Sequence, residues 1–384
     1  MDRPESFPSS LAVASVEPFV LRLPIAEPKQ TPMGLVDSAI ALFVRVETTA
    51  GEVGWGEVWC NFPRYGALHR ALVVSRSIAP FLRSRTFEGP LDAFDAMHRA
   101  THVLRLQSGD HGPVSAAIAG VDIALWDIVA RRERLPLWKL LGGASGRIGA
   151  YASTGRADGI EPLLEQAMAQ GFRGIKMRCW GDPAQHIGAY ERARAIAGQD
   201  FQIMADGNSS WPLAQAADWA QRFAGVGLSF LEEPIPVDAP IEAWQALAAR
   251  SPAPLAGGEN MISREMFDTA LAGGAHRVLQ PDACKWSGFS AGVPLARDIV
   301  ARGLRFCPHM FSGAVGLMAA AHLLAASGSP DGLLEYGIEH NPPRDEIARL
   351  AIVDGWIELG DAPGLGIELD AGELERWRVQ VPAW

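Results

Sequence analysis

Seven polar residues recur from residue 176 onward, each at the end of a short apolar run. They are nearly evenly spaced, with gaps of 30, 26, 27, 23, 27 and 26 residues. Five are carboxylic acids, one is a lysine and one is a histidine, which are the residue types that bind hard metal ions and transfer protons. The seven residues are Lys176, Asp206, Glu232, Glu259, Asp282, His309 and Glu335. If the fold brings these positions together, they form one reactive site.

Asp206, Glu232 and Glu259 end three successive runs and are the candidate metal ligands. Three carboxylates about 4 Å apart repel one another by roughly 4 kcal/mol per pair at an effective dielectric constant of ~20. Without a cation, some of them would have to bind protons. Ligation by oxygen alone favours Mg²⁺, or Mn²⁺ as a substitute, over zinc. A single acidic residue at a strand end is more often a helix cap or a surface group, but three in succession predict a shared metal site.

His309 is the candidate proton acceptor, because its ionisation range suits proton transfer near neutral pH. Asp282 ends the preceding run and could hold the other ring nitrogen, which would fix the tautomer. Taken alone, His309 could equally be a packed core histidine, and Glu335 could be a helix-capping acid. Their positions at successive strand ends favour a catalytic interpretation for both.

The spacing also predicts the fold, because a strand, a loop, a helix and a return loop fill about this length in a barrel of alternating strands and helices. The runs are GFRGIK (171–176), FQIMAD (201–206), LSFLE (228–232), PLAGGE (254–259), RVLQPD (277–282), LRFCPH (304–309) and GLLE (332–335). IGAYAS at 148–153 is an eighth candidate strand, and stretches such as AQAADWAQRFAGV at 214–226 have helical apolar spacing. Strand ends gather on one face of such a barrel, so the seven residues should converge.

The residues upstream of the barrel have a different pattern. AIALFVRVET and EVGWGEVW, within residues 39–59, alternate as two strands joined in a hairpin at Ala50-Gly51. Residues 66–133 have helical spacing instead. We therefore expect an α+β unit over 1–134, a barrel over 135–338 and a C-terminal segment over 339–384 that packs back on the first unit.

Composition limits the classes of partner. The chain has 384 residues, of which 48% are hydrophobic and 20% charged, which is ordinary for a globular enzyme. Its net charge of −10, with no block rich in Lys and Arg, argues against nucleic-acid binding. The four cysteines show no CxxC pairing, no signal peptide is apparent and no uninterrupted apolar 18-mer occurs. A cytoplasmic protein that does not bind membranes is expected.

An ordered set of segments resembles the enolase superfamily, specifically its mandelate racemase subgroup. The segments are IKMR, MADGN, FLEEP, GGEN, QPDACK, PHMF and LEY. GWGE at 54–57, GVDIALWD at 120–127, LPLWKLLGG at 135–143 and the terminal PGLGIELD also look like that family, so the resemblance covers nearly the whole chain.

The resemblance implies an α/β fold, namely a modified TIM barrel (β/α)7β with an N-terminal α+β capping domain. It implies Mg²⁺ held by Asp206, Glu232 and Glu259, a base dyad of His309 with Asp282, and Glu335 as a hydrogen-bonding acid. In such enzymes a small carboxylate substrate loses its α-proton and forms an enediolate, whose added negative charge a divalent ion stabilises. The family also often forms homo-oligomers, so a homo-oligomer is expected from the resemblance alone.

The second strand departs from the subgroup's usual pattern, in which Lys-x-Lys supplies a second base. Here the segment reads Lys176-Met177-Arg178. A guanidinium remains protonated, so Arg178 is a poor proton acceptor and a good clamp for a carboxylate. One-base chemistry is therefore favoured, that is, dehydration of an acid sugar to a 2-keto-3-deoxy acid, with Lys176 holding or polarising the substrate carboxylate. The alternative is a racemase or epimerase in which Lys176 is the second base.

Other polar residues near the strand ends are candidates for substrate binding. Asn208 and Lys285 could contact the substrate or could be loop residues satisfied by backbone. Specificity should come from the capping unit, in the loops around 23–38 and 58–66. Within these loops Lys29 and Arg64 could meet a distal group of the substrate, although an ordinary surface position is the simpler interpretation of each.

Three other classes of protein agree less well with these residues. A barrel that binds a ligand without turnover would not need His309, Asp282 and Glu335 together. A hydrolase using metal-bound water would usually offer a His-x-His pair at a strand end, and none occurs among the nine histidines. A dinucleotide site has only Gly143-x-x-Gly146-x-x-Gly149, which lacks the required spacing.

Overall fold

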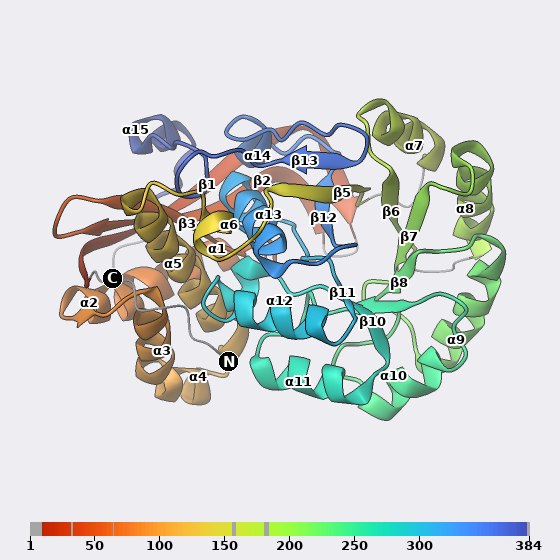
Figure 1. The fold of residues 1–384 in the computed structure, drawn as a ribbon, viewed down its shortest axis with the longest axis horizontal. Coiled ribbons are helices and arrows are strands. Elements are labelled where there is room, and N and C mark those ends of the chain that lie inside the picture. Colours follow the sequence, from red (N-terminus) through yellow and green to blue (C-terminus); the bar gives the residue numbers. More distant parts are fainter. Residues whose placement is uncertain (1–9, 32–33, 64, 156–158, 180–183, 382–384) are drawn as a thin grey trace.

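The structure is a computed structural model that describes residues 10–31, 34–63, 65–155, 159–179 and 184–381. Figure 1 shows two units along the long axis, with the N-terminal unit in red to brown at one end and the barrel in green to blue at the other. The expected architecture, a capping α+β unit on a (β/α)7β barrel, is confirmed. The division at residues 134 and 338 remains a prediction.

The N-terminal unit has a four-stranded antiparallel sheet covered by helices. Its strands are β1 (Leu11–Thr31), β2 (Gly34–Thr48), β3 (Val53–Val58) and β4 (Thr86–Phe87), in the order β3-β2-β1-β4. The helices are α1 (Gly66–Leu72), α2 (Ala79–Arg83), α3 (Pro90–Ala100), α4 (His102–Ser108) and α5 (His111–Arg132). The predicted hairpin is confirmed, and Gly51 turns the chain at a φ of +83°.

The segment expected to be a loop around 23–38 is largely strand, so that prediction was wrong. Residues up to Thr31 belong to β1 and those from Gly34 belong to β2. The family resemblance suggested the loop. The β1–β2 register instead shifts between Pro24 and Lys29, and an irregularity of this kind accommodates proline in a strand.

Helix α5 is the core of the N-terminal unit. It is long and apolar enough to cross a membrane, but 94% of its most apolar window is buried inside the protein, as in a core helix. Strand β3 packs directly against it. A Cβ atom at Gly56 would lie 1.8 Å from the carbonyl oxygen of Gly120, so this close approach requires glycine.

The barrel has eight parallel strands, in agreement with the eight predicted runs. They are β5 (Arg147–Ser153), β6 (Gly174–Arg178), β7 (Gln202–Asp206), β8 (Phe230–Glu232), β9 (Leu255–Gly257), β10 (His276–Leu279), β11 (Arg305–Phe306) and β12 (Leu333–Gly337). The hydrogen-bonded order is β11-β10-β9-β8-β7-β6-β5-β12. The barrel interior is filled by side chains that include Tyr151, Met204 and Phe230.

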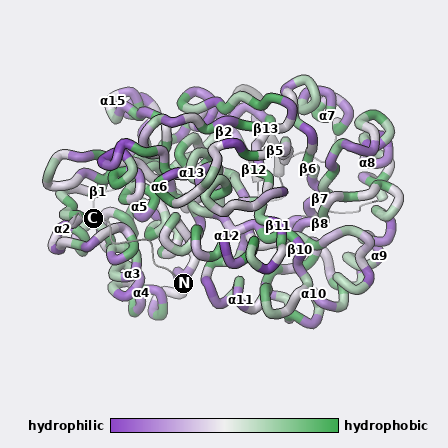
Figure 2. Tube along the Cα trace, in the orientation of Figure 1, coloured by the Kyte–Doolittle hydropathy of each residue, from purple (hydrophilic) through white to green (hydrophobic). Residues whose placement is uncertain are grey.

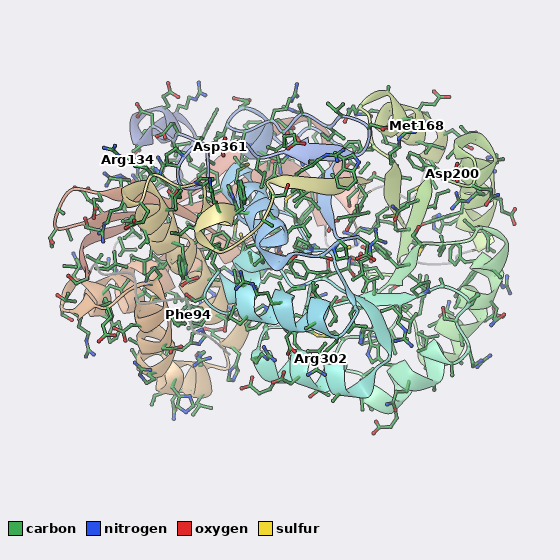
Figure 3. The ribbon with its side chains drawn as sticks, in the orientation of Figure 1. Phe94, Arg134, Met168, Asp200, Arg302 and Asp361 are labelled. Atoms are coloured by element: carbon green, nitrogen blue, oxygen red, sulfur yellow. The ribbon has the colours of Figure 1, made fainter. Side chains whose placement is uncertain are left out.

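Helices cover the outside of the barrel. After α6 (Leu137–Leu140) they are α7 (Ile160–Ala169), α8 (Ala184–Ala197), α9 (Leu213–Arg222), α10 (Ile241–Ala248), α11 (Arg264–Gly273), α12 (Gly292–Ala301) and α13 (Ala314–Ser327). Figure 2 shows hydrophobic and hydrophilic residues mixed along helices such as α9 to α11, as expected when one helix face packs on the strands. In Figure 3 the exposed residues Met168 and Asp200 lie toward the outer edge, on the side of the helices.

The C-terminal segment contacts both units, whereas the sequence suggested contact with the first unit alone. It contains α14 (Pro342–Asp345), β13 (Trp356–Glu358) and α15 (Ala371–Leu374). Strand β13 pairs antiparallel with β5, so this part extends the barrel sheet. Farther along, the backbone N–H of Leu365 donates to Asp127 of α5, and Arg378 reaches Glu17 of β1.

Candidate active site

The carboxyl ends of the barrel strands carry the predicted residues. Asp206 and Glu232 are the last residues of β7 and β8, and the two are paired in register. Lys176 and Arg178 lie on β6, with Arg178 in register with Asp206. Glu335 lies on β12. The remaining three follow their strands within three residues, and they are Glu259 after β9, Asp282 after β10 and His309 after β11.

Lys176 is at the centre of the acidic cluster. Its Nζ atom lies 2.6 and 2.7 Å from the two carboxylate oxygens of Glu232 and 2.9 Å from Oε1 of Glu335. The same atom is 3.9 Å from Oδ2 of Asp206, which also contacts the guanidinium of Arg178. Lys176, Asp206 and Glu232 are each no more than 1% exposed. The cations of β6 therefore neutralise carboxylates of the site directly.

Burial favours the protonated form of carboxyl groups in this cluster. Desolvation raises the pKa of Glu232 to about 8 despite Lys176, and it also raises the pKa of Asp206. Glu259 is the exception. Burial raises its pKa as well, but His309 and Lys285 together lower it well below the usual range. Burial therefore favours protonation of Asp206 and Glu232, whereas a bound cation would keep both ionised.

The donor set fits a hard divalent cation in its chemistry. Asp206, Glu232 and Glu259 offer only oxygen atoms, from three neighbouring strands. Among the described residues, no three acidic, histidine or cysteine side chains converge closely enough to ligate one ion as they stand. Lys176 and His309 lie between the carboxylates instead, so an ion would enter by displacing these contacts.

His309 is held between two carboxylates. Its Nδ1 atom lies 2.7 Å from Oδ2 of Asp282, and its Nε2 atom lies 2.8 Å from Oε2 of Glu259. Burial alone would lower the pKa of His309, but Glu259 and Asp282 raise it to about 10. Asp282 is itself anchored, since its Oδ1 atom accepts hydrogen bonds from the backbone N–H groups of Cys284 at 2.7 Å and Lys285 at 3.2 Å. The imidazole therefore has a fixed orientation.

Glu335 is placed to accept hydrogen bonds. It accepts from Oγ of Ser153 at 2.6 Å and from the backbone N–H of Met310 at 3.3 Å. Burial raises its pKa, but Lys176 and His309 outweigh that effect and lower it overall. Glu335 is therefore ionised as it stands, although it is only 3% exposed.

The predicted substrate-binding residues lie around the acidic cluster. The backbone N–H of Asn208 donates to Asp206 at 2.7 Å, and its Nδ2 atom lies 3.5 Å from Glu259. The ammonium of Lys285 lies 4.4 Å from the centre of the Trp59 ring and donates to Oδ1 of Asn260 at 3.2 Å. Arg64 and the side chain of Lys29 lie outside what the structure describes.

Three polar residues of the site were missed in the sequence. Gln280 donates from Nε2 to Glu232 at 2.6 Å. Asn260 donates from Nδ2 to both Glu259, at 3.0 Å, and Glu233, at 2.8 Å. Trp59 brings the N-terminal unit against Lys285. Gln280 and Asn260 lie within two residues of a predicted site residue, so considering every polar residue near each strand end would have found them.

Two family models match this chain. One is described as Enolase C-terminal domain-like and matches residues 160–373. The other is the Mandelate racemase / muconate lactonizing enzyme, N-terminal domain, and matches residues 15–142. The two matched ranges correspond to most of the barrel and most of the capping unit.

Similar proteins include two curated relatives. D-galactarolactone cycloisomerase from Agrobacterium fabrum is 29% identical, over 97% of this chain and 100% of the relative. Arabinonate dehydratase from Saccharolobus solfataricus is also 29% identical, over 87% of this chain and 89% of the relative.

Two solved structures have the same fold over nearly the full length. A mandelate racemase/muconate lactonizing enzyme from Bordetella bronchiseptica RB50 is 42% identical, with a TM-score of 0.91, covering 96% of this chain and 99% of the other. A racemase from Streptomyces coelicolor A3(2) with bound magnesium is 26% identical, with a TM-score of 0.84, covering 96% and 100%. The chain therefore belongs to the enolase superfamily, in its mandelate racemase/muconate lactonizing enzyme group.

Proposed function

We propose that this protein dehydrates an acid sugar to a 2-keto-3-deoxy acid in a reaction that depends on Mg²⁺. The observation that carries the proposal is the buried His309–Asp282 pair beside a carboxylate cluster in which Arg178 occupies the position of a second base. Asp206, Glu232 and Glu259 would hold the ion, and the Streptomyces coelicolor structure contains magnesium. When bound, Mg²⁺ supplies positive charge that stabilises a deprotonated carboxylate substrate.

His309 is the proposed base and, later, the acid. Its Nδ1 atom is held by Asp282, so only Nε2 can exchange a proton with substrate. While Nε2 faces Glu259 the ring stays protonated. If Glu259 held an ion instead, Nε2 would be free to accept the α-proton. The proton then resides on Nε2, from which it can pass to the departing β-hydroxyl group.

The cations of β6 favour one-base chemistry. Arg178 has its pKa raised, chiefly because Asp206 outweighs the effect of burial. Lys176 has its pKa raised in the same way by Glu232 and Glu335. Both side chains therefore remain protonated and suit the binding of a substrate carboxylate better than the removal of a proton. Epimerisation is the second candidate, with Lys176 as the second base, because the Streptomyces coelicolor neighbour is described as a racemase.

Proton NMR in D₂O tests the proposal. The protein with Mg²⁺ is incubated with monoacid and diacid sugars, simple 2-hydroxy acids and sugar lactones, the last because one relative is a D-galactarolactone cycloisomerase. Loss of one acid sugar with appearance of a 2-keto-3-deoxy product supports dehydration. Deuterium at the α-carbon with inversion and no loss of water supports epimerisation instead.

We place the reaction in the cytoplasm and expect a homo-oligomer, with neither nucleic acid nor a membrane as partner. All four cysteines are free and buried, as in a reducing compartment. Light scattering coupled to size exclusion measures the oligomeric state, and a mass of one chain would contradict that expectation.

A further inference from the structure

Glu57 connects the capping unit to a barrel helix. It is the last residue of the GWGE segment, lies on β3 and is only 2% exposed. Its Oε1 atom accepts a hydrogen bond from the backbone N–H of Gly313 at 2.6 Å, and Oε2 accepts one from Gly316 at 2.7 Å. Gly313 directly precedes α13 and Gly316 lies in its first turn, and the helix lies where the two units meet (Figure 1). A carboxylate at this place complements the positive end of the helix.

The backbone of β3 around Glu57 is held firmly against α5. Gly54 and Gly56 let β3 approach α5 so closely that a Cβ atom at either position would overlap backbone atoms of that helix. The backbone N–H of Trp55 donates to Asp127 of α5 at 3.0 Å. On the other side, a Cβ atom at Gly313 would lie 3.1 Å from the Glu57 carboxylate, so glycine there permits the contact. The carboxylate therefore holds α13 against a rigid support.

The segment that Glu57 holds also carries His309. Only residues 310–312 separate this histidine from Gly313, and within them the backbone N–H of Met310 donates to Glu335 at 3.3 Å. Displacing the start of α13 would thus move His309 and the N–H group that donates to Glu335. An error of about 1 Å in the placement of a reacting group can cost about 10²-fold in rate.

We propose that Glu57 is a positioning residue, which fixes the segment from His309 to Gly316 and thereby keeps His309 against Asp282. The anchoring itself is independent of the reaction; only its consequence for catalysis rests on the proposed function. The GWGE segment thus connects the capping unit to the segment that carries His309, in addition to forming part of the sheet.

Glu57→Gln is the informative variant. An amide replaces one acceptor oxygen by an NH₂ group, which meets a backbone N–H at the distance of a hydrogen bond and repels it. Asp122→Asn is the matched control. Asp122 is a fully buried residue of α5 and accepts from the backbone N–H groups of Phe289 at 2.8 Å and Ser290 at 3.0 Å. It also joins the two units, but a single oxygen, Oδ2, accepts both of these N–H bonds, and Oδ1 accepts from the Oγ hydroxyl of Ser290 at 2.6 Å. An amide at this position can therefore keep its contacts.

Hydrogen–deuterium exchange measured by mass spectrometry tests the anchor without any substrate. The protein is studied at pH 8, because burial raises the pKa of Glu57 to about 7. We expect Glu57→Gln to speed amide exchange in peptides covering 310–317 by at least about tenfold, with little change at 286–291. Asp122→Asn should leave exchange in both regions unchanged, because its remaining oxygen can accept both N–H groups. Unchanged exchange at 310–317 in Glu57→Gln would overturn the proposal.

Kinetics test the consequence on the wild-type substrate. Glu57→Gln should lower kcat by about 10- to 100-fold while KM and the Mg²⁺ affinity change less than about threefold, because His309 moves and the ligands do not. Asp122→Asn should keep kcat within about threefold of wild type. If both variants lose kcat equally, Glu57 has no specific positioning role.

Two outcomes need separate treatment, namely a variant that does not fold and a wild-type protein that shows no activity. If Glu57→Gln does not fold, Glu57→Asp replaces it in both assays; its shorter carboxylate keeps the charge but should leave at least one N–H of α13 without its acceptor. If the wild-type protein acts on no acid, the proposed function fails, while hydrogen exchange still decides whether the anchor exists.

Discussion

The Nε2 atom of His309 lies 2.8 Å from Oε2 of Glu259. The proposed base and a proposed metal ligand are therefore in direct contact, and the same ring is held from the other side by Asp282 at 2.7 Å. While the contact lasts, Glu259 keeps the imidazole protonated. One carboxylate thus connects the part of the site that would hold the ion to the part that would move the proton.

Removing the charge of Glu232 should abolish the response to Mg²⁺. A ligand present at 100 times its Kd stabilises a protein by about 2.7 kcal/mol, so Mg²⁺ should raise the melting temperature of the wild-type protein measurably. Glu232→Gln should show no such shift and no turnover. Glu233→Gln is the control, because Glu233 is already bonded to Ser209 and Asn260, each at 2.8 Å. A full shift in Glu232→Gln would contradict the assignment of the ligands.

Arg178→Lys should create a second base. Lysine loses its proton far more easily than arginine in a buried site, and the variant restores the Lys-x-Lys pattern of the subgroup. We expect slow deuterium incorporation at the α-carbon of the epimer that the wild-type protein leaves unchanged, as measured by NMR in D₂O. Arg178→Met should incorporate none. If Arg178→Lys and Arg178→Met behave alike, position 178 does not decide between the two reactions.

Lys285→Met should weaken substrate binding more than it slows the chemical step. Lys285 is 6% exposed, and its ammonium lies between Trp59 and Asn260 beside the acidic cluster. If it binds an anionic or hydroxyl group of the substrate, KM should rise about 10-fold or more with kcat within about threefold. The exposed Lys139, replaced by Met, is the control. Equal KM values in the two variants would exclude Lys285 from substrate binding.

His276 should make the protein less stable in acid. It is 2% exposed, its ring centre lies 4.4 Å from that of Trp244, and neither ring nitrogen has a hydrogen-bond partner among the described residues. Burial lowers its pKa from 6.5 to about 4. Between these values the unfolded chain binds a proton that the folded chain does not. The free energy of unfolding should therefore fall as the pH drops through this range, by on the order of 3 kcal/mol.

Urea unfolding at pH 7 and pH 5 measures this effect. The loss of stability on going to pH 5 should be about 2 kcal/mol smaller in His276→Phe than in the wild-type protein. Replacing the exposed His102 by Gln should leave the loss unchanged. Parallel losses in all three proteins would show that His276 does not contribute to the acid sensitivity.

Much of the barrel could be predicted because strands buried on both faces are short apolar runs, and their even spacing reflects one strand and one helix per repeat. The long strand β1 could not, since Pro24 and Pro28 look like loop residues and only the irregular pairing with β2 accommodates them. Strand β13 was not identified as a partner of β5, because that pairing joins residues about 200 positions apart and leaves no local signal.

In the site, too, the positions of the residues could be predicted, but the contacts between their side chains could not. Strand-end spacing identified Glu232 and His309, but it did not indicate that Lys176 bonds Glu232 and Glu335 or that Glu259 faces the imidazole. Such contacts depend on how side chains pack across strands. Glu57 was missed as a functional candidate for the same reason, since its partners lie more than 250 residues away.

His309→Asn shows whether His309 alone moves the α-proton. Asparagine is polar and can still bond Asp282, but it cannot accept a proton. With the substrate identified, α-deuterium incorporation and loss of water are measured side by side by NMR in D₂O with Mg²⁺, for the wild-type protein and the variant. We predict that both processes fall by at least about 10²-fold in the folded variant, for either epimer. Continued exchange of one epimer in His309→Asn would contradict it and would assign a second base to the site.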